Sequence, residues 1–371
     1  MKKIAVACVG CGDLALRGVL PHLALRDAHD KVELVAVCDV DEERARTTSQ
    51  RFNVGNWQTD YNQLLRDPSV EMVLLLTPTP LHAEQAIAAM RSGKHVYLQK
   101  PIGGSLEEAQ GVVSESEKNG VRLLVAPAQR LCPLIGEMRK RIVNGEIGTV
   151  YWALTATHWP TTYEGSDFDR SWHYRKGGGP LCDRTIYSLA TLTDLVGPAR
   201  RVTALSGLRE THRHSKDRNV RVEVHDNTLL LLEHAQGVYA VATGNYCKDG
   251  KVVPAGFIGI YGSQGSMETV EVDPGTWYPT KVEVRCDSGK EGWVQHTVQC
   301  SLDEVPGLTG GHALLPEAHV YADIMHLVDC VLEDKEPICH IGQAQHLVEV
   351  IEKAYLAAET GQTQTVTTRF D

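Results

Sequence analysis

Short apolar runs alternate with amphipathic helical patterns over the first third of the chain. Residues 4–9, Ile-Ala-Val-Ala-Cys-Val, form the first run, which is continuous and rich in β-branched side chains. Such runs are typical of parallel strands that are buried on both faces. Further strands are expected at 33–38, 72–77, 95–99 and 121–126, with helices at 81–91 and 106–119. The alternation predicts an α/β fold with a doubly wound parallel sheet.

From Leu131 onward the regular alternation ends, which marks a second domain. Short strand patterns separated by Gly, Asn and Asp turns lie at 150–157, 228–233, 238–243 and 257–261. This spacing favours a mainly antiparallel sheet. Helical patterns return near the end, at 321–332 and 341–359. A length of 371 residues also fits two domains, which we place at 1–128 and 129–371.

A glycine-rich turn follows the first strand and precedes a helical pattern. It reads Gly10-Cys11-Gly12-Asp13-Leu14-Ala15. Gly10 permits the tight turn, Gly12 lets the backbone approach a pyrophosphate, and Ala15 lets the helix pack against the strand. The helix N-terminus adds N–H donors and a positive dipole for the phosphates. We therefore expect all six residues of this turn to bind a dinucleotide.

Asp39 closes the second strand and indicates which dinucleotide is bound. Its carboxylate can accept hydrogen bonds from a ribose 2′-OH and would repel a 2′-phosphate, which favours NAD over NADP. Arg44 lies nearby and keeps NADP as the less favoured alternative. We expect both Asp39 and Arg44 to contact the cofactor.

Two loops stiffened by proline leave the carboxyl ends of later strands, where ligands bind in sheets of this kind. Lys100 in the second loop is a long cation on a rigid turn beside the expected nicotinamide, which favours a functional role. The loops are Thr77-Pro78-Thr79-Pro80-Leu81-His82 and Gln99-Lys100-Pro101. From the first loop we expect cofactor contacts by Thr77, Pro78 and His82.

The composition narrows the range of functions. Lys and Arg number 37 against 47 Asp and Glu, a net charge of −10, which offers no electrostatic footprint for nucleic acid or an anionic membrane. The longest apolar runs fall short of the roughly 18 residues of a membrane span, and the N-terminal run is too short for a signal peptide. Ten cysteines are too sparse for a disulfide scaffold, so we expect a reducing cytoplasm.

Metal and redox sites are the main alternative uses of the cysteines and histidines. Cys8 and Cys11 form a C-x-x-C, but no second C-x-x-C completes a four-cysteine site. His212 and His214 fall in the polar stretch 210–219, which we interpret as a solvated loop. No H-E-x-x-H or comparable ligand set is present. We expect no bound metal.

Several motifs occur in an order that links the two domains. They are Val9-Gly10-Cys11-Gly12, the 77–82 loop, Gly93-Lys94-His95-Val96 leading into Gln99-Lys100-Pro101, and Gly177-Gly178-Gly179-Pro180-Leu181-Cys182-Asp183. With them, nearly the whole chain resembles the glucose-fructose oxidoreductase/inositol dehydrogenase family, abbreviated Gfo/Idh/MocA. The resemblance implies a Rossmann domain followed by an α/β domain with a large, mostly antiparallel open sheet. It also implies that this sheet covers the nicotinamide and builds an oligomer interface, and that the last helices pack near the Rossmann domain.

The resemblance also implies roles for individual residues. The lysine of the Lys-Pro pair acts at the substrate hydroxyl that is oxidised, which implies a catalytic Lys100. The preceding residue, Gln99, is implied to contact the nicotinamide ribose. Asp183 is implied to be a catalytic partner, and Trp172 and Arg175 to reach the cofactor.

Two positions depart from the pattern of the family. Gln99 stands where Glu is usual, so it adds no negative charge beside Lys100. Asp183, Tyr187 and Ala190 stand where many members have Asp, His and Asp, so the usual imidazole proton acceptor is missing. Glucose-fructose oxidoreductase and its relatives carry tyrosine there. A cation beside a tyrosine stabilises the phenolate, so Tyr187 can replace the imidazole.

Other residues and activities stay open. His173 titrates near neutrality and is an alternative proton acceptor, while His158 and Trp159 can line a sugar site. The leading interpretation is NAD-dependent hydride transfer at a hydroxyl-bearing carbon of a sugar, sugar derivative or cyclitol, by a homodimer or homotetramer. The alternatives are a glycoside hydrolase that oxidises its sugar transiently, and a non-catalytic NAD(H) or sugar sensor.

Overall fold

The computed structural model describes residues 2–158, 163–164, 168–246, 256–273, 278–287 and 292–370. The chain divides into two compact units. The first unit comprises Met1–Gly103, Glu107–Ala128 and Val305–Ile341, and the second comprises Gly104–Leu106, Gln129–Glu304 and Gly342–Asp371. A segment late in the chain, 305–341, is therefore part of the first unit.

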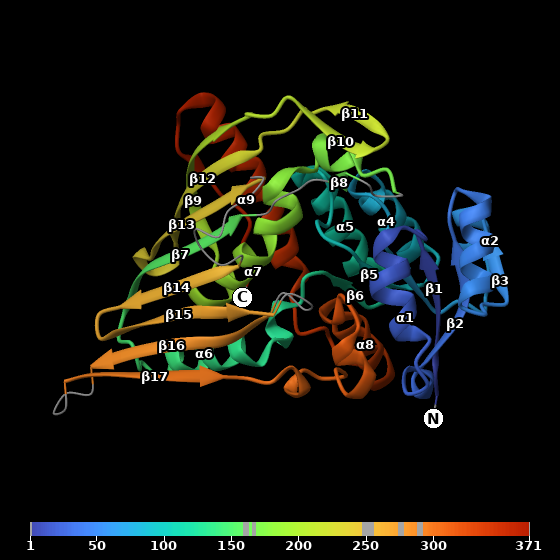
Figure 1. Ribbon diagram of the computed structural model, residues 1–371, viewed down its shortest axis with the longest axis horizontal. Helices are drawn as coiled ribbons and strands as arrows, with labels where there is room; N and C mark the ends of the chain where they lie inside the picture. The colour runs from blue at the N-terminus through green and yellow to red at the C-terminus, as the bar shows by residue number, and fades with distance from the viewer. Residues whose placement is uncertain are drawn as a thin grey trace. The chain divides into compact units, whose positions relative to one another are not determined.

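A parallel sheet forms the centre of the first unit, which confirms the predicted doubly wound fold (Figure 1). Its strands are β1 (Ile4–Val9), β2 (Val32–Cys38), β3 (Asn56–Gln58), β4 (Met72–Leu75), β5 (His95–Leu98) and β6 (Leu123–Val125). They lie in the order β3-β2-β1-β4-β5-β6, and every neighbouring pair is parallel. The side chains of β4 are all buried and those of β1 nearly so, which explains their continuous apolar sequences.

Helices connect these strands, except for α8, which joins this unit from later in the chain. They are α1 (Leu20–Leu23), which continues a π-helical segment at Ala15–Val19, α2 (Glu42–Arg51), α3 (Tyr61–Leu65), α4 (His82–Arg91), α5 (Leu106–Asn119) and α8 (Ala318–Glu333). Side-chain caps explain where two of them begin. Asp41 accepts a hydrogen bond from the Arg44 N–H before α2, and Asp60 accepts two backbone N–H groups before α3.

A large, mostly antiparallel sheet forms the second unit, as expected (Figure 1). Over the described residues it has nine strands in the order β17-β16-β15-β14-β7-β13-β12-β9-β18, and only β7 and β13 pair in parallel. The strands are β7 (Val150–His158), β9 (Ala199–Gly207), β12 (Asn227–His234), β13 (Tyr239–Asn245), β14 (Phe257–Gly262), β15 (Gly265–Val272), β16 (Pro279–Asp287), β17 (Trp293–Gln299) and β18 (Gln364–Thr365).

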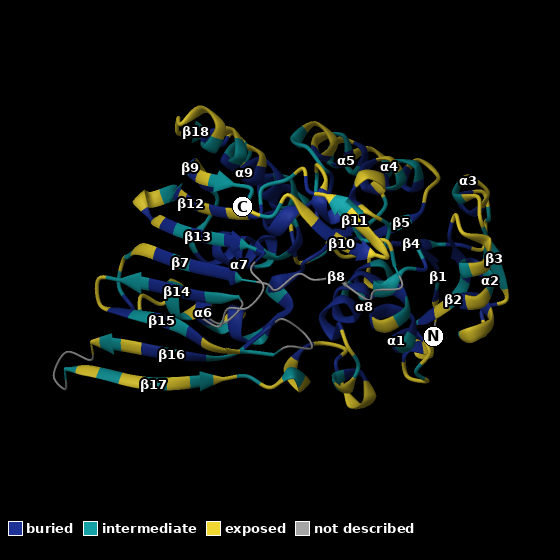
Figure 2. Cartoon of the chain, turned by 45° about the horizontal axis from the view of Figure 1, so that its top comes forward, coloured by how far each residue is buried: buried dark blue, intermediate teal, exposed yellow. Residues whose placement is uncertain are grey.

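Only one face of this sheet is covered within the unit. Helix α6 (Pro133–Val143) contacts β16, and α7 (Ile186–Val196) contacts β7 and β14, while α9 (Ile341–Thr360) completes the helices of the unit. On β12, Leu230 and Leu232 are buried whereas Leu229 and Leu231 are exposed. Figure 2 shows this alternation of buried and exposed positions along the strands. The sheet is therefore half-buried, as its alternating sequence requires.

The polar stretch 210–219 is not the solvated loop that its composition predicts. It forms β10 (His212–Lys216), which pairs with β11 (Arg218–Arg221) and β8 (Tyr163–Glu164) in a small separate sheet. Along β10, Arg213 and Ser215 are buried while His212 and His214 are exposed. The prediction was wrong because β10 buries a charged side chain where a strand usually buries an apolar one. Arg213 forms a buried ion pair with Asp226, so the sequence lacks the apolar alternation from which a strand is recognised.

The segment 305–341 is tied to the first unit by buried rings. Helix α8 contacts β5 and β6, and the rings of His22, His312 and Tyr321 are stacked on one another. The Nδ1 atoms of His22 and His312 are 3.0 Å apart. Two facing Nδ1 atoms form a hydrogen bond only when one of them lacks its proton, so this contact needs a neutral ring. Burial lowers the pKa of His22 to about 4, in agreement with that requirement.

Among the described residues, no helix is long and apolar enough to cross a membrane.

Asp323 of α8 is a buried acid in the first unit. Its Oδ2 accepts the Ala128 N–H at 3.3 Å, and among the described residues Oδ1 has no hydrogen-bond partner. Burial raises the pKa of Asp323 to about 8, because one backbone donor does not compensate for the loss of water. In the folded chain this carboxyl group therefore keeps its proton near neutral pH.

We expect Asp323→Asn to stabilise the protein at alkaline pH. The unfolded chain loses the Asp323 proton near pH 4 and the folded chain near pH 8, so wild-type stability falls as pH rises between these values, by up to about 1.4 kcal/mol per pH unit. Asn keeps the acceptor and carries no charge. Urea unfolding at pH 5 and pH 8 measures the difference, which should be larger at pH 8. Equal differences at the two pH values would contradict a protonated Asp323.

Candidate active site

The glycine-rich turn after β1 has the shape that a dinucleotide requires. Gly10 has a φ of +90°, and a Cβ placed there would lie 3.0 Å from the backbone carbon and oxygen of Leu76. Glycine is therefore the residue that suits this position. A Cβ at Gly12 would meet nothing within 4 Å, so open space lies where a pyrophosphate would approach. Leu14 is half-buried and Ala15 fully buried, which packs the following helix on the sheet.

The structure brings together three of the predicted cofactor residues at the end of β2. Asp39 Oδ2 accepts the Cys11 N–H at 2.8 Å, and Asp39 Oδ1 accepts the Asp41 N–H at 2.9 Å. The guanidinium of Arg44 lies 3.2 Å from the same carboxylate. Asp39 is thus fixed beside the glycine-rich turn as an acceptor for a ribose hydroxyl. Because the Arg44 guanidinium already pairs with Asp39, it is not available as a separate partner for a 2′-phosphate.

Asp13, in the first helical turn after the glycines, is held by Arg17. Arg17 Nε donates to Asp13 Oδ2 at 2.7 Å, and Arg17 Nη2 lies 2.6 Å from Glu317 Oε1. A Cβ at Gly18 would come within 2.6 Å of the Glu317 Cβ, so these segments are in close contact. The segment 305–341 therefore helps to shape the cofactor turn, although no local sequence pattern indicates it.

His82 connects the two proline-stiffened loops. Its Nδ1 lies 2.6 Å from the carbonyl oxygen of Pro101, and its Nε2 lies 2.8 Å from the carbonyl oxygen of Thr77. Carbonyl oxygens only accept, so the ring donates one hydrogen bond when neutral and two when protonated. Burial lowers the pKa of His82, against the opposite effect of the two carbonyls. With 1% of its surface exposed, His82 is a brace between the loops.

Lys100 leaves the carboxyl end of β5 between two fixed neighbours. Gln99 is buried, and its Nε2 donates to the Tyr97 hydroxyl at 2.8 Å. On the other side, the carbonyl of Pro101 meets His82. Lys100 itself is half-buried, so its long side chain starts from a backbone that is held on both sides.

In the second unit, the glycine motif leads to a buried carboxylate. Asp183 lies in the π-helical segment Leu181–Thr185 and is 6% exposed. Its Oδ2 lies 3.8 Å from His173 Nδ1 and 3.5 Å from Arg184 Nε. The ring of Trp172 stacks on His173, with centroids 3.7 Å apart. The structure therefore brings together Trp172, a predicted cofactor contact, and His173 and Asp183, two predicted catalytic residues.

The other candidates of this unit are more dispersed. Tyr187 is half-buried in α7, one turn beyond Asp183. Arg175 is exposed on the chain after the Ser171–Tyr174 turn. His158 ends β7 and its Nδ1 meets the side-chain nitrogen of Asn245, whereas Trp159 lies outside the described residues. Lys100 belongs to the first unit, and all of these residues belong to the second.

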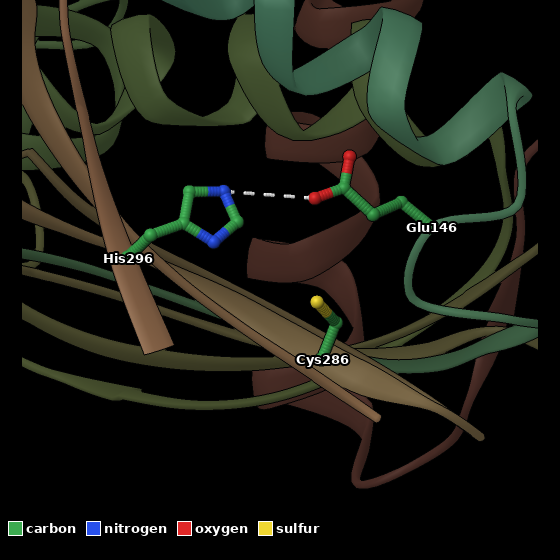
Figure 3. A group of neighbouring side chains, drawn as sticks. All are labelled: Glu146, Cys286 and His296. Carbon is green, nitrogen blue, oxygen red and sulfur yellow. Dashed lines mark ion pairs between the residues drawn. The ribbon is translucent and has the colours of Figure 1, made fainter. Parts of the chain in front are cut away.

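Within the described part of the chain, one group of side chains has the chemical types of metal ligands. Glu146, Cys286 and His296 lie near one another in the second unit (Figure 3). However, Arg141 Nη1 donates to both Glu146 oxygens, at 2.6 and 2.8 Å, and lies 3.2 Å from His296 Nε2. A metal would have to displace this cation, so we interpret the group as an ion-pair cluster.

In the C-x-x-C of Cys8 and Cys11, burial raises the pKa of the Cys11 thiol to about 12, which disfavours a thiolate ligand or nucleophile.

The geometry defines a Rossmann unit with the turn of a dinucleotide-binding site, and the comparison with protein families identifies the class of protein as an oxidoreductase. Residues 4–126 match the Gfo/Idh/MocA family described as "Oxidoreductase family, NAD-binding Rossmann fold". Residues 135–268 match the "GFO/IDH/MocA C-terminal domain". The chain belongs to the Gfo/Idh/MocA family of oxidoreductases, and its cofactor is NAD.

Named relatives cover the chain to different extents. Trans-1,2-dihydrobenzene-1,2-diol dehydrogenase of Mus musculus is 24% identical over 326 residues, which is 87% of each chain. The scyllo-inositol 2-dehydrogenase (NAD(+)) of Bacillus subtilis (strain 168) is 28% identical over 179 residues, 47% of this chain and 49% of that enzyme. A levoglucosan dehydrogenase solved with NADH and levoglucosan has the same fold, with a TM-score of 0.84 and 20% identity over 99% of this chain and 100% of that one.

We expect His82→Asn to weaken NAD binding and to destabilise the first unit. The shorter side chain cannot reach both carbonyls, and a buried carbonyl without a donor costs about 1–3 kcal/mol. Isothermal titration with NAD and urea unfolding measure the two effects. His234→Asn is the matched control, because His234 is also buried and contacts one carbonyl, that of Gly197, in the second unit. A His82→Asn protein that binds NAD like the wild type would contradict the role of His82 as a brace between the two loops.

Proposed function

We propose that this protein is an NAD-dependent dehydrogenase or reductase that transfers hydride between nicotinamide and a hydroxyl-bearing carbon of a sugar, sugar derivative or cyclitol. The observation that carries the proposal is the position of Lys100, at the carboxyl end of β5 in an NAD-binding sheet and on a turn braced by His82. Ligands of doubly wound sheets bind at that edge. The relatives above are dehydrogenases of a diol, an inositol and levoglucosan, which supports this substrate class.

The first unit supplies the cofactor site in this proposal. NAD, when bound, accepts or returns the hydride. The glycine-rich turn and Asp39 hold its pyrophosphate and ribose, and Thr77, Pro78 and Gln99 line the nicotinamide end. Lys100 orients the substrate hydroxyl and stabilises the negative charge that forms on its oxygen as the proton leaves.

The second unit supplies the remaining proton chemistry. Asp183 is a buried acceptor for a substrate hydroxyl, and its surroundings are already organised by His173 and Arg184. Tyr187 takes the position of the imidazole that many family members carry, and we propose it as the proton acceptor, with His173 as the alternative. Trp172 and Arg175 are proposed cofactor contacts. The second unit, which is mainly the predicted domain 129–371 without residues 305–341, thus serves as the substrate-binding domain.

We expect wild-type protein with NAD⁺ and a panel of aldoses, cyclitols and glycosides to produce NADH, measured by absorbance at 340 nm. Lys100→Ala should lower kcat at least about 100-fold and leave NAD binding unchanged, because the residue acts on the substrate hydroxyl. Lys118→Ala, at an exposed lysine near the end of α5, is the control and should keep full activity.

Several results would contradict this assignment. A Lys100→Ala protein that binds NAD and keeps its rate would exclude a catalytic Lys100. Sugar released from a glycoside without net NADH would instead indicate a hydrolase that uses NAD transiently. An NAD-binding protein that neither makes NADH nor releases sugar would indicate a sensor.

We also propose that the open face of the large sheet binds a second copy of the chain. Leu205, Leu231 and Tyr239 are 75%, 51% and 54% exposed on this face, although all three are apolar or aromatic. Leu205 lies opposite Leu229, and Tyr239 lies beside Trp152, so these side chains form a continuous apolar patch over β9, β12, β13 and β7. Exposed patches of this kind mark interfaces.

The charges beside this apolar patch favour self-association. Arg201 Nε donates to Glu233 Oε2 at 2.6 Å, so the two charges on its margin cancel. A patch without net charge does not repel its own copy, and the same surface on two chains can meet around a two-fold axis. We propose a homodimer or homotetramer built on this face, in agreement with the family resemblance.

We expect Leu231→Glu to convert the oligomer into single chains. Each interface between two chains would bury two facing carboxylates, which would lose their water without gaining partners. Light scattering after size-exclusion chromatography measures the mass. Leu314→Glu is the matched control, since Leu314 is 87% exposed in the first unit. An unchanged mass for Leu231→Glu, or a single-chain mass for the wild type, would exclude this interface.

The cellular location is a further part of the proposal. The cysteines of the described residues are free thiols, and two of them, Cys8 and Cys38, are buried in strands of the first unit. Free thiols persist in reducing compartments. We propose that the protein acts in the cytoplasm.

A further inference from the structure

We propose that Tyr246 is a positioning residue that holds the carboxylate of Asp183, and that a buried Arg213–Asp226 ion pair holds Tyr246 in turn. The proposal rests on the proposed function, because it assigns Asp183 to the substrate. Tyr246 follows β13, is 3% exposed and had no motif in the sequence to mark it.

The first step of the argument is the contact with the carboxylate. The Tyr246 hydroxyl donates to Asp183 Oδ2 at 3.2 Å in a buried environment. The same oxygen faces His173 Nδ1 at 3.8 Å and Arg184 Nε at 3.5 Å, so the tyrosine makes the shortest of these three approaches. A hydrogen bond to a buried carboxylate is among the stronger ones, because the charge is poorly hydrated there. Tyr246 therefore fixes the rotation of the Asp183 side chain.

The second step is the rigidity of Tyr246 itself. Arg213 Nη2 donates to the Tyr246 carbonyl at 2.9 Å, and its guanidinium lies 5.6 Å from the centre of the Tyr246 ring. The Tyr246 N–H donates to the Asp226 carbonyl at 2.9 Å. The backbone of Tyr246 is thus bonded on both sides, and its ring is covered by a cation. These contacts hold Tyr246 in place independently of the hydrogen bond between its hydroxyl and Asp183.

The third step is the anchor beneath these contacts. Arg213 Nη2 lies 3.2 Å from Asp226 Oδ2, and the two side chains are 4% and 1% exposed. Asp226 also accepts the N–H groups of Arg209 and Glu210, at 2.9 and 3.0 Å. A buried ion pair persists when its remaining hydrogen bonds are satisfied, as they are at Asp226. The chain of contacts therefore runs from the β10–β11 hairpin to Asp183.

A second tyrosine in the same cluster provides a control within the structure. Tyr174 and Tyr246 pack in one buried cluster with Val222. The Tyr174 hydroxyl donates to the backbone carbonyl of His214 at 3.3 Å, whereas the Tyr246 hydroxyl donates to a carboxylate. Each substitution by Phe removes one hydroxyl from the same buried cluster. Only the loss of the Tyr246 hydroxyl removes a donor from Asp183.

The test compares Tyr246→Phe with Tyr174→Phe. Without the donor, the ionised form of Asp183 is less favoured, so the acid limb of the pH profile of kcat/KM should move up by about one pH unit. We expect kcat to fall about tenfold with a smaller change in KM, and Tyr174→Phe to keep the wild-type profile. The groups facing Asp183 in this unit include His173, Arg184 and Tyr246, and only Tyr246 changes. An unmoved acid limb in Tyr246→Phe, or an equal shift in both variants, would overturn the proposal.

A measurement without turnover separates this proposal from the proposed function. In protein labelled with ¹³C at the aspartate carboxyl groups, the Asp183 signal is identified with Asp183→Asn and titrated in the presence of NAD. Tyr246→Phe should move this titration to higher pH, even if no sugar is oxidised. Replacement of Tyr246 by 3-fluorotyrosine, a stronger donor with the same ring, should move it to lower pH and remains informative if Tyr246→Phe does not fold. A titration that stays unchanged in whichever of these proteins folds would exclude the positioning role.

Discussion

Two contacts of the buried His82 ring determine the shape of the first unit at the carboxyl ends of its strands, which is the edge where ligands bind in such sheets. The parallel sheet holds its strands by backbone hydrogen bonds, but these bonds end where the loops begin. His82 takes over at that point, because its ring meets the carbonyl of Thr77 on one side and that of Pro101 on the other. A buried carbonyl without a donor is costly, so the two loops cannot separate without losing stability. The turn that carries Lys100 is therefore fixed in advance of any ligand.

The same physical rule organises the carboxylates of both units. Asp39 is buried beside the glycine-rich turn and satisfied by the Cys11 N–H and by Arg44. Asp183 is buried in the second unit and meets the Tyr246 hydroxyl. A buried charge is tolerated only when such donors are present, and the donors also fix its direction. Each carboxylate is thus held in one direction by its own donors, and a pre-oriented acceptor is what specific recognition of a ligand hydroxyl requires.

How far the sequence predicts this arrangement depends on the range of the contacts. The strands of the first unit, Gly10 and Asp39 were predictable because their signals lie within a few residues of one another. The hairpin that contains Arg213 was not, since a buried arginine is recognisable only with its partner Asp226. No local pattern places residues 305–341 in the first unit, because the evidence is a contact such as Arg17–Glu317, between residues 300 positions apart; the family resemblance alone implied that the last helices pack near the Rossmann domain. Local patterns identify strands and cofactor turns, while long-range polar pairs need coordinates.

The unusual Gln99 has a local explanation in this framework. Its Nε2 donates to the Tyr97 hydroxyl in a buried position, a contact that a glutamate carboxylate cannot make as a donor. A glutamate at this position could accept a hydrogen bond from the Tyr97 hydroxyl instead, so the difference that the amide makes is one of charge: this position of the turn stays uncharged beside Lys100. In the proposed function, the acidic group assigned to the substrate, Asp183, belongs to the second unit, while the cation, Lys100, belongs to the first.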